Sequence, residues 1–204
     1  MGTMQFLTFP VRSLTLFYAM LLWPGRYAFW GVVDSSAYYP ALMYDSGVWS
    51  IRLLIAALAV TPVLLAINRI GRGQVLGRWL LLRRRHLGIA SAIYAGVHLF
   101  HYLRAVGGLN AVVFDLRLLA YQTGWASLII LGTLAATSNA RAVRAMGRGW
   151  KRLHLWVYPA GVLALWHWYL LDWYTGRVLF WCAIFAVPII AKWGLRRLRG
   201  RLFA

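Results

Sequence analysis

Six long apolar segments decide what this chain can fold into. Each is apolar on nearly all sides, as lipid-facing helices are, and most approach the roughly 20 residues that a helix needs to cross a bilayer. Hydrophobic residues make up 62% of the 204 residues, whereas a soluble domain has about half. We therefore predict an all-α polytopic membrane protein, a six-transmembrane-helix bundle in which residues 1–204 form a single domain. The predicted helices span residues 13–33, 48–67, 86–106, 124–138, 153–171 and 178–193.

The charged residues between these segments predict how the bundle lies in the membrane. Most of the 22 basic residues fall in the linkers 68–85 and 139–152 and beyond residue 191. Because loops rich in Lys and Arg stay in the cytoplasm, we expect both termini and both basic linkers there. Six helices satisfy this alternation, whereas five or seven would break it. The four acidic residues all fall in the other linkers, at Asp34, Asp45, Asp115 and Asp172.

Composition also excludes several classes of function. A net charge of +18 would suggest nucleic acid for a soluble protein, but basic cytoplasmic loops beside anionic lipid account for it here. We therefore expect the lipid bilayer, and no nucleic acid, as a partner. The single cysteine, Cys182, excludes an internal disulfide and a thiolate-bound cluster. The glycines of residues 71–77 lack the spacing of a dinucleotide-binding loop, and no cleavable signal is recognised, so we expect the first helix to be retained.

Histidines inside apolar segments indicate function, because an ionisable side chain in a membrane helix rarely lacks a role. Neutral imidazole binds iron and tolerates lipid, so histidines that face each other are candidate axial haem ligands. His98 lies about 18 Å beyond His86, and His167 lies about 20 Å beyond His154, along their helices. His98 and His167 therefore share one depth toward the periplasm. His86 and His154 share another toward the cytoplasm.

The rotation between the two histidines of the fifth segment is less favourable than their depth. At about 100° per residue, the separation turns His167 about 140° away from His154. Pro159 lies between them, and a proline removes a backbone hydrogen bond and can kink or rewind a helix. Our hypothesis is that this proline realigns the two imidazoles.

Each candidate also has an explanation that needs no cofactor. A single histidine in a membrane helix often makes a hydrogen bond between helices, which applies to His98 and His167 taken one at a time. His154 also suits the membrane interface beside two basic residues, and His86, which follows three arginines, suits a solvated loop end. His101, one turn after His98, suits packing or a place near haem propionates, with ligation as the minor alternative.

Arginines near the periplasmic helix ends are candidates for binding haem propionates, because these carboxylates need cationic partners. Snorkelling of the same side chains to the interface explains them equally well. The arginines concerned are Arg26, Arg52 and Arg104.

The chain resembles a known family, the MsrQ (YedZ) proteins, over roughly residues 47–190. MsrQ is the haem-binding membrane subunit of the bacterial protein-methionine-sulfoxide reductase system. It belongs to the ferric reductase-like transmembrane group, which includes the NADPH oxidases. The residues that carry the resemblance are Thr61-Pro62, Arg84-Arg85-His86-Leu87-Gly88, Tyr94, His98, Thr137-Ser138, Trp150-Lys151-Arg152-Leu153-His154, Val157-Tyr158 and His167.

The resemblance implies a single ferric reductase-like transmembrane domain that holds b-type haem between its third and fifth helices. It implies His98, His154 and His167 as the haem ligands, and the family often carries a flavin mononucleotide (FMN) as well. It further implies electron flow from a cytoplasmic flavin reductase or quinol to a periplasmic molybdopterin subunit, which reduces methionine sulfoxide. Two histidine ligands leave no open position on iron, so we expect substrate chemistry on the partner.

Two departures from the family leave alternatives open. The loop before the fourth helix reads Leu118-Leu119-Ala120-Tyr121-Gln122 where the family usually has Arg-Pro-Tyr, which leaves the partner's identity open. His86 stands where the family usually has an apolar residue, and it could pair with His154 to complete a second haem. The competing functions are a ferric reductase or oxidase-like haem protein with another acceptor, and a haem-free transporter or assembly factor.

Overall fold

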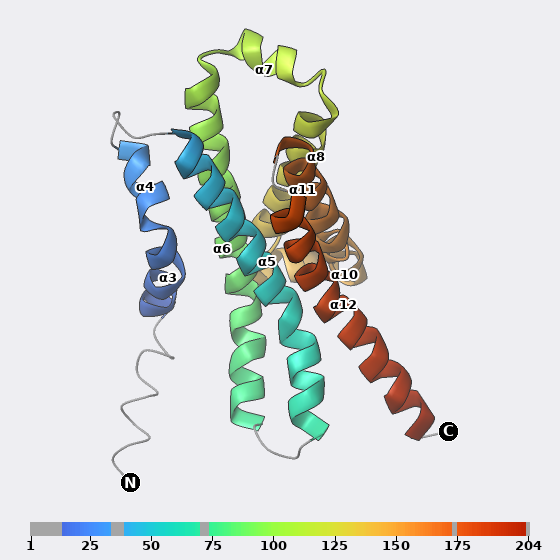
Figure 1. The fold of residues 1–204 in the computed structure, drawn as a ribbon. Coiled ribbons are helices and arrows are strands. Elements are labelled where there is room, and N and C mark those ends of the chain that lie inside the picture. Colours follow the sequence, from blue (N-terminus) through green and yellow to red (C-terminus); the bar gives the residue numbers. More distant parts are fainter. Residues whose placement is uncertain (1–13, 34–38, 70–73, 173–174, 203–204) are drawn as a thin grey trace.

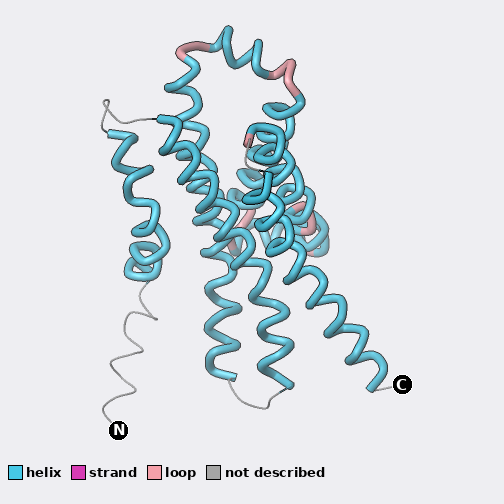
Figure 2. Tube along the Cα trace, viewed as in Figure 1, coloured by secondary structure: helices cyan, strands magenta, loops and turns pink. Residues whose placement is uncertain are grey.

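The computed structural model describes residues 14–33, 39–69, 74–172 and 175–202, and helix accounts for nearly all of them (Figures 1 and 2). The short loops that Figure 2 shows lie mainly on either side of α7 and between the helices that follow α8. This agrees with the predicted all-α class. The elements are α3 (Leu14–Leu22), η1 (Trp23–Gly25), α4 (Arg26–Val33), α5 (Tyr39–Arg69), α6 (Gln74–Val106), α7 (Leu109–Asp115), α8 (Leu119–Ala136), α9 (Ala140–Met146), α10 (Arg148–His154), α11 (Val157–Leu171) and α12 (Thr175–Leu202).

All six apolar segments are mostly helical where the structure describes them. Among the described residues, three helices are long and apolar enough to cross a membrane, namely Pro40–Asn68, Leu119–Ala136 and Thr175–Gly194. Large apolar side chains such as Ile129, Val187 and Ile190 lie mostly exposed on the outside, as lipid-facing residues do. The count of six membrane spans stays a prediction.

The first segment is broken into two helices rather than forming one. α3 ends at Leu22, and a 3₁₀ turn containing Pro24 and Gly25 leads into α4. Proline supplies no backbone N–H, so the regular hydrogen-bond ladder cannot continue through this turn. Tyr94 of α6 closes the break, because its hydroxyl lies 3.1 Å from the carbonyl oxygens of Leu21 and Leu22 and accepts the Gly25 N–H at 3.1 Å.

α5 and α6 are longer than the sequence predicts. α5 begins at Tyr39, and α6 begins at Gln74 and takes in most of the basic linker. The residues added to α6 are rich in Leu and Arg, which are strong helix formers. His86 therefore lies well inside α6 and not at the start of a helix.

The fifth segment is also interrupted, between its two histidines. α10 ends at His154, a turn follows at Leu155 and Trp156, and α11 begins at Val157. Pro159 lies in the first turn of α11, where a missing N–H costs little because those N–H groups have no helical partner. The 140° estimate, which assumes one continuous helix, therefore does not apply.

The core is built from two antiparallel helix pairs, α5 with α6 and α8 with α11, with α12 packed against α5 (Figure 1). Buried apolar residues from α5, α8, α11 and α12 form one cluster that joins the pairs, including Leu54, Leu131, Leu165 and Phe185. The short helix α7 connects the upper ends of α6 and α8 in Figure 1, at the opposite end of the bundle from the end of α5 and the start of α6. α6 carries His98 and α11 carries His167, and the two histidines lie at the same level of the bundle.

Candidate functional site

A cavity of about 440 Å³ lies between the two helix pairs. Its volume falls within the roughly 300–1,000 Å³ of small-molecule and cofactor sites. The wall is formed by α5, α6, α8 and α11, mostly by apolar and aromatic side chains. His98 and His167 both line it, so the sequence prediction that these two share one depth is matched by their positions.

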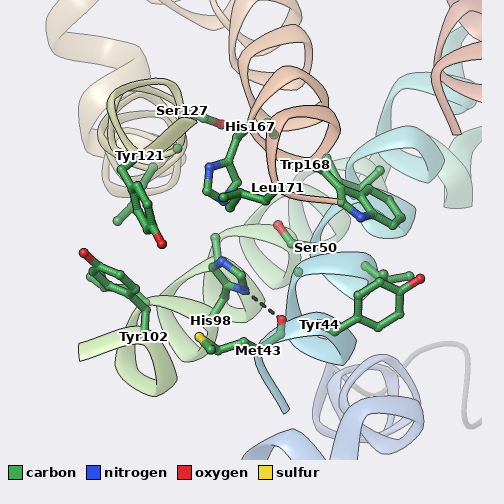
Figure 3. Close-up of a pocket in the computed structure, with 18 of the residues that line it drawn as sticks. Met43, Tyr44, Ser50, His98, Tyr102, Tyr121, Ser127, His167, Trp168 and Leu171 are labelled. Atoms are coloured by element: carbon green, nitrogen blue, oxygen red, sulfur yellow. Dashed lines mark hydrogen bonds between the residues drawn. The ribbon is translucent and has the colours of Figure 1, made fainter. Parts of the chain in front are cut away.

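The imidazoles of His98 and His167 point toward one another across this cavity (Figure 3). Their ring centres are 6.1 Å apart and the ring planes are nearly perpendicular, at 89°. His98 comes from α6 and His167 from α11, so each helix pair contributes one ring. Both side chains are half-buried, because each has a surface facing the cavity.

Hydrogen bonds fix which nitrogen of each ring faces the cavity. Nδ1 of His98 lies 2.8 Å from the carbonyl oxygen of Met43, and Nδ1 of His167 lies 2.7 Å from that of Ala120. A carbonyl oxygen only accepts, so each Nδ1 carries the proton and donates it. Each Nε2 then keeps its lone pair and is the nitrogen able to bind a metal, the arrangement usual for metal-ligating histidines.

The spacing of the rings fits a metal ion held between them. An imidazole nitrogen binds a metal at about 2 Å, and with about 1 Å more from that nitrogen to its ring centre, two opposed ligands place ring centres about 6 Å apart. The observed 6.1 Å agrees with this. Both imidazoles are neutral nitrogen donors facing an apolar cavity, and such a donor set suits haem iron.

Two tyrosines and an aspartate stand at one side of the pair. The rings of Tyr102 and Tyr121 are 5.6 Å apart, and Tyr121 lies 6.4 Å from the ring of His167 (Figure 3). The hydroxyl of Tyr102 donates to the Asp115 carboxylate at 2.8 Å. This bond ties α7 to α6 beside the cavity, so it helps to hold the wall at that end.

His154 and His86 have different surroundings from the facing pair. His154 stacks on Trp150 with ring centres 3.8 Å apart, its Nδ1 donates to the Trp150 carbonyl at 3.1 Å, and its Nε2 lies 3.3 Å from the Ser138 hydroxyl. His86 is buried on α6, and its Nδ1 lies 2.9 Å from the hydroxyl of Tyr18 on α3. The two histidines are therefore engaged by different neighbours, and their pairing stays a prediction.

The remaining candidates lie outside the cavity wall. His101 is fully buried and its Nε2 donates to the Ala28 carbonyl at 2.8 Å, which ties α4 to α6. Arg52 packs over the rings of Trp49 and Trp181, at 4.6 and 5.2 Å. Arg104 lies over the ring of Phe100 at 5.8 Å, and Arg26 lies over Trp23 and Tyr27. Their assignment to propionates stays a prediction.

Sequence reasoning missed the groups that hold the facing pair. Met43 and Ala120 act through their backbone carbonyls, which every residue type has, so their identity carries no signal. Tyr102 lies one turn after His98, and Asp115 is a rare acid in an apolar chain. That combination was the available signal for the tyrosine–aspartate contact.

Comparison with protein families adds an independent finding. Residues 46–165 match the family described as ferric reductase like transmembrane component. The match includes α6, α8 and the start of α11, and it contains His98 and His154.

Several curated relatives share one description, protein-methionine-sulfoxide reductase heme-binding subunit MsrQ. The relative from Xanthomonas axonopodis pv. citri is 36% identical over 132 residues, which are 62% of this chain and 56% of the relative. The relative from Xanthomonas euvesicatoria pv. vesicatoria is 33% identical over 74% of this chain and 69% of its own length. The relative from Brucella anthropi is 34% identical over 72% of this chain and 66% of its own length. The match thus spans little more than half of the first relative's length.

Proposed function

The chain belongs to the ferric reductase-like transmembrane family and to the MsrQ family, and from this premise we propose that its cavity binds haem through His98 and His167. The observation that carries the proposal is the facing pair of imidazoles, each with Nδ1 donating to a carbonyl and Nε2 directed into the cavity. The relatives' description as heme-binding subunits supports the choice of group. When bound, haem supplies a one-electron redox centre.

The residues of this chain would orient that group and shield it from water. His98 and His167 line the gap from opposite sides and would hold the group between them, which would leave no place for a substrate at the metal. The largely apolar wall limits access of water, which is one way in which a protein sets a redox potential. We therefore propose electron transfer, with substrate chemistry on a partner protein.

We propose that the partners are those that the family resemblance implies. Electrons would enter from a cytoplasmic flavin reductase or quinol and leave to a periplasmic molybdopterin subunit that reduces methionine sulfoxide. The relatives' description names a methionine-sulfoxide reductase, which supports the acceptor. The distribution of Arg and Lys supports six spans in the inner membrane with both termini in the cytoplasm. Reporter fusions at the two basic linkers would test that orientation.

Two further cofactors remain predictions from the sequence. A second haem would use His154, which the resemblance implies as a ligand, with His86 as its partner. FMN would add a flavin to the same chain. Acid extraction of the purified protein followed by flavin fluorescence tests the second of these directly.

The experiment that tests the haem proposal is an absorption spectrum with haem quantitation on the full chain purified in detergent. We expect a Soret band in the wild-type protein and its marked loss in His98→Ala and in His167→Ala. His101→Gln, a change one helical turn from His98, serves as the matched control and should keep the band. A wild-type protein without a Soret band after expression with ample haem would overturn the proposal.

A second candidate function is electron transfer to ferric chelates or oxygen. It is favoured by the match to the ferric reductase like family over residues 46–165. Mixing the reduced protein with each acceptor and following reoxidation of the haem by absorbance distinguishes the two functions. Fast reoxidation that requires the molybdopterin subunit and methionine sulfoxide supports the first, and fast reoxidation by ferric chelates alone supports the second.

A further inference from the structure

The two histidines of the facing pair are held by two local arrangements of the same design. On α5, the carbonyl of Met43 binds His98 and Gly47 follows four residues later. On α8, the carbonyl of Ala120 binds His167 and Gly124 follows four residues later. The same helix position relative to the carbonyl is therefore a glycine in both halves of the site.

The likeness extends one turn further along each pair. The hydroxyl of Ser50, three residues after Gly47, donates to the Ser91 carbonyl at 3.0 Å. The hydroxyl of Ser127, three residues after Gly124, donates to the Ala160 carbonyl at 2.8 Å. Both carbonyls belong to the residue seven positions before the histidine, and these bonds lie between the same two helices as the histidine bonds. In each helix pair, a histidine bond and a serine bond therefore occur at matching positions along the two helices.

Helix geometry explains why a glycine is needed at this position. A side chain on an α-helix leans toward the N-terminus and covers the turn before its own Cα. A side chain four residues after Met43 or Ala120 would therefore lie over the carbonyl that binds the histidine. Besides the imidazole, that carbonyl accepts a hydroxyl three residues later, from Ser46 on Met43 at 3.0 Å and from Thr123 on Ala120 at 2.8 Å, so the space around it is already filled.

The histidine rings occupy the space that a side chain would fill. A Cβ added at Gly124 would lie 2.7 Å from Nδ1 and 2.9 Å from Cε1 of His167. A Cβ added at Gly47 would lie 3.1 Å from Nδ1 and 3.3 Å from Cε1 of His98. The first is closer than real Cβ atoms approach their neighbours, and the second is tight, so the two positions should respond to substitution to different degrees.

We propose that Gly47 and Gly124 are positioning residues that seat His98 and His167 on their carbonyls and thereby direct each Nε2 into the cavity. This rests on the proposed haem ligation by the same two histidines. Any residue larger than glycine would displace the ring and weaken its Nδ1 hydrogen bond. Loss of such a supporting bond typically costs about 10- to 100-fold in metal affinity.

The test compares alanine substitutions at these two glycines in the full chain purified in detergent. Haem per protein, the reduction potential and the electron paramagnetic resonance signal of the ferric protein are measured for each. Gly124→Ala should lower haem affinity by about 10- to 100-fold, and a displaced His167 should let added imidazole bind and restore the low-spin spectrum. Gly47→Ala should keep haem but shift the potential and the resonance signal.

Two other glycines provide matched controls. Gly132 lies on α8 with Gly124, and Gly96 lies on α6 with His98; a Cβ at either meets nothing within 4 Å. Alanine favours a helix over glycine, so Gly132→Ala and Gly96→Ala should behave as the wild type. The proposal would be overturned if both Gly124→Ala and Gly47→Ala matched these controls in all three measurements.

Two outcomes separate this proposal from the haem proposal and from misfolding. A wild-type protein without haem would refute haem ligation, whereas haem in the wild type with no effect of either alanine would refute only the role of the glycines. If Gly124→Ala does not accumulate in the membrane, Gly47→Ala decides alone, because its contact is tight without being prohibitive. An unshifted potential and resonance signal in that variant would then refute the proposal.

Discussion

His98 and His167 share one predicted depth and His86 and His154 share another, but the structure holds the two pairs differently. His98 and His167 each donate from Nδ1 to a carbonyl on a different helix, and their rings point at one another. His154 donates to a carbonyl one turn earlier in its own helix, and His86 contacts a tyrosine hydroxyl. The two pairs therefore differ in their hydrogen bonds, and a second site at His86 and His154 stays a prediction. What distinguishes the facing pair is that Nδ1 of both rings donates to a carbonyl beside the cavity, which leaves both Nε2 atoms toward the cavity.

The largest expected difference between the two levels comes from removing one imidazole at a time. His167→Ala should reduce haem at its site to background, because a single remaining imidazole supplies half of the ligation. Gly132→Ala, on α8 of the same helix pair and with nothing within 4 Å of an added Cβ, should keep the haem. Pyridine haemochrome assays on equal amounts of protein measure both. Equal haem content in His167→Ala and the wild type would contradict haem ligation by the facing pair.

The second-haem prediction gives an intermediate effect. If His86 and His154 bind a haem of their own, His86→Ala removes one of two haems and lowers haem per protein by about half. His154→Ala should do the same, and the spectrum of the remaining haem should be that of the facing pair. Unchanged haem in His86→Ala would remove His86 as a ligand and sharpen the contrast between the levels.

A smaller effect is expected from the tyrosine–aspartate bond beside the facing pair. Tyr102→Phe removes the hydroxyl that donates to Asp115, and a hydrogen bond to a charged group contributes about 1.5–3 kcal/mol when buried and less when partly exposed, as here. The free energy of unfolding should fall by roughly 1 kcal/mol, measured by circular dichroism in detergent. Haem content should not change, and a large loss would show that this contact also shapes the cavity.

The smallest effect is expected at the opposite level. Tyr18→Phe removes the hydroxyl bonded to His86; this bond is neutral and part-buried, so the loss should lie near the lower end of about 0.5–1.5 kcal/mol. The rings of Tyr18 and His86 pack edge to face, 5.4 Å apart, and this contact survives the substitution. Thermal unfolding of Tyr18→Phe and Tyr102→Phe, measured under the same conditions, compares the two losses of stability. A larger loss for Tyr18→Phe would reverse the expected order.

The sequence was sufficient for those features that depend on helical rise and on composition. The all-α class and the shared level of His98 and His167 follow from apolar segments and from about 1.5 Å of rise per residue. The family resemblance was confirmed by the comparisons. Each of these depends on residue type and spacing alone, so a single chain carries enough information.

Other features depend on contacts between distant segments, and the sequence did not reveal them. The Tyr18–His86 bond joins residues 68 positions apart, so it follows from packing of α3 on α6 and not from a local pattern. The rotation between His154 and His167 was estimated for a continuous helix, and the turn at Leu155 and Trp156 removes that phase relation. The carbonyls of Met43 and Ala120 have no signature at all.

Holding one histidine on each helix pair has a consequence for how the protein senses its surroundings. Because each ring is fixed to its own pair, the gap between the Nε2 atoms follows any sliding or tilting of one pair against the other. Helices tilt when the hydrocarbon thickness of a bilayer changes. If iron is bound in that gap, its absorption and magnetic resonance spectra would report the spacing of the two Nε2 atoms. Lipids of different chain length should therefore shift the spectra of an otherwise unchanged protein.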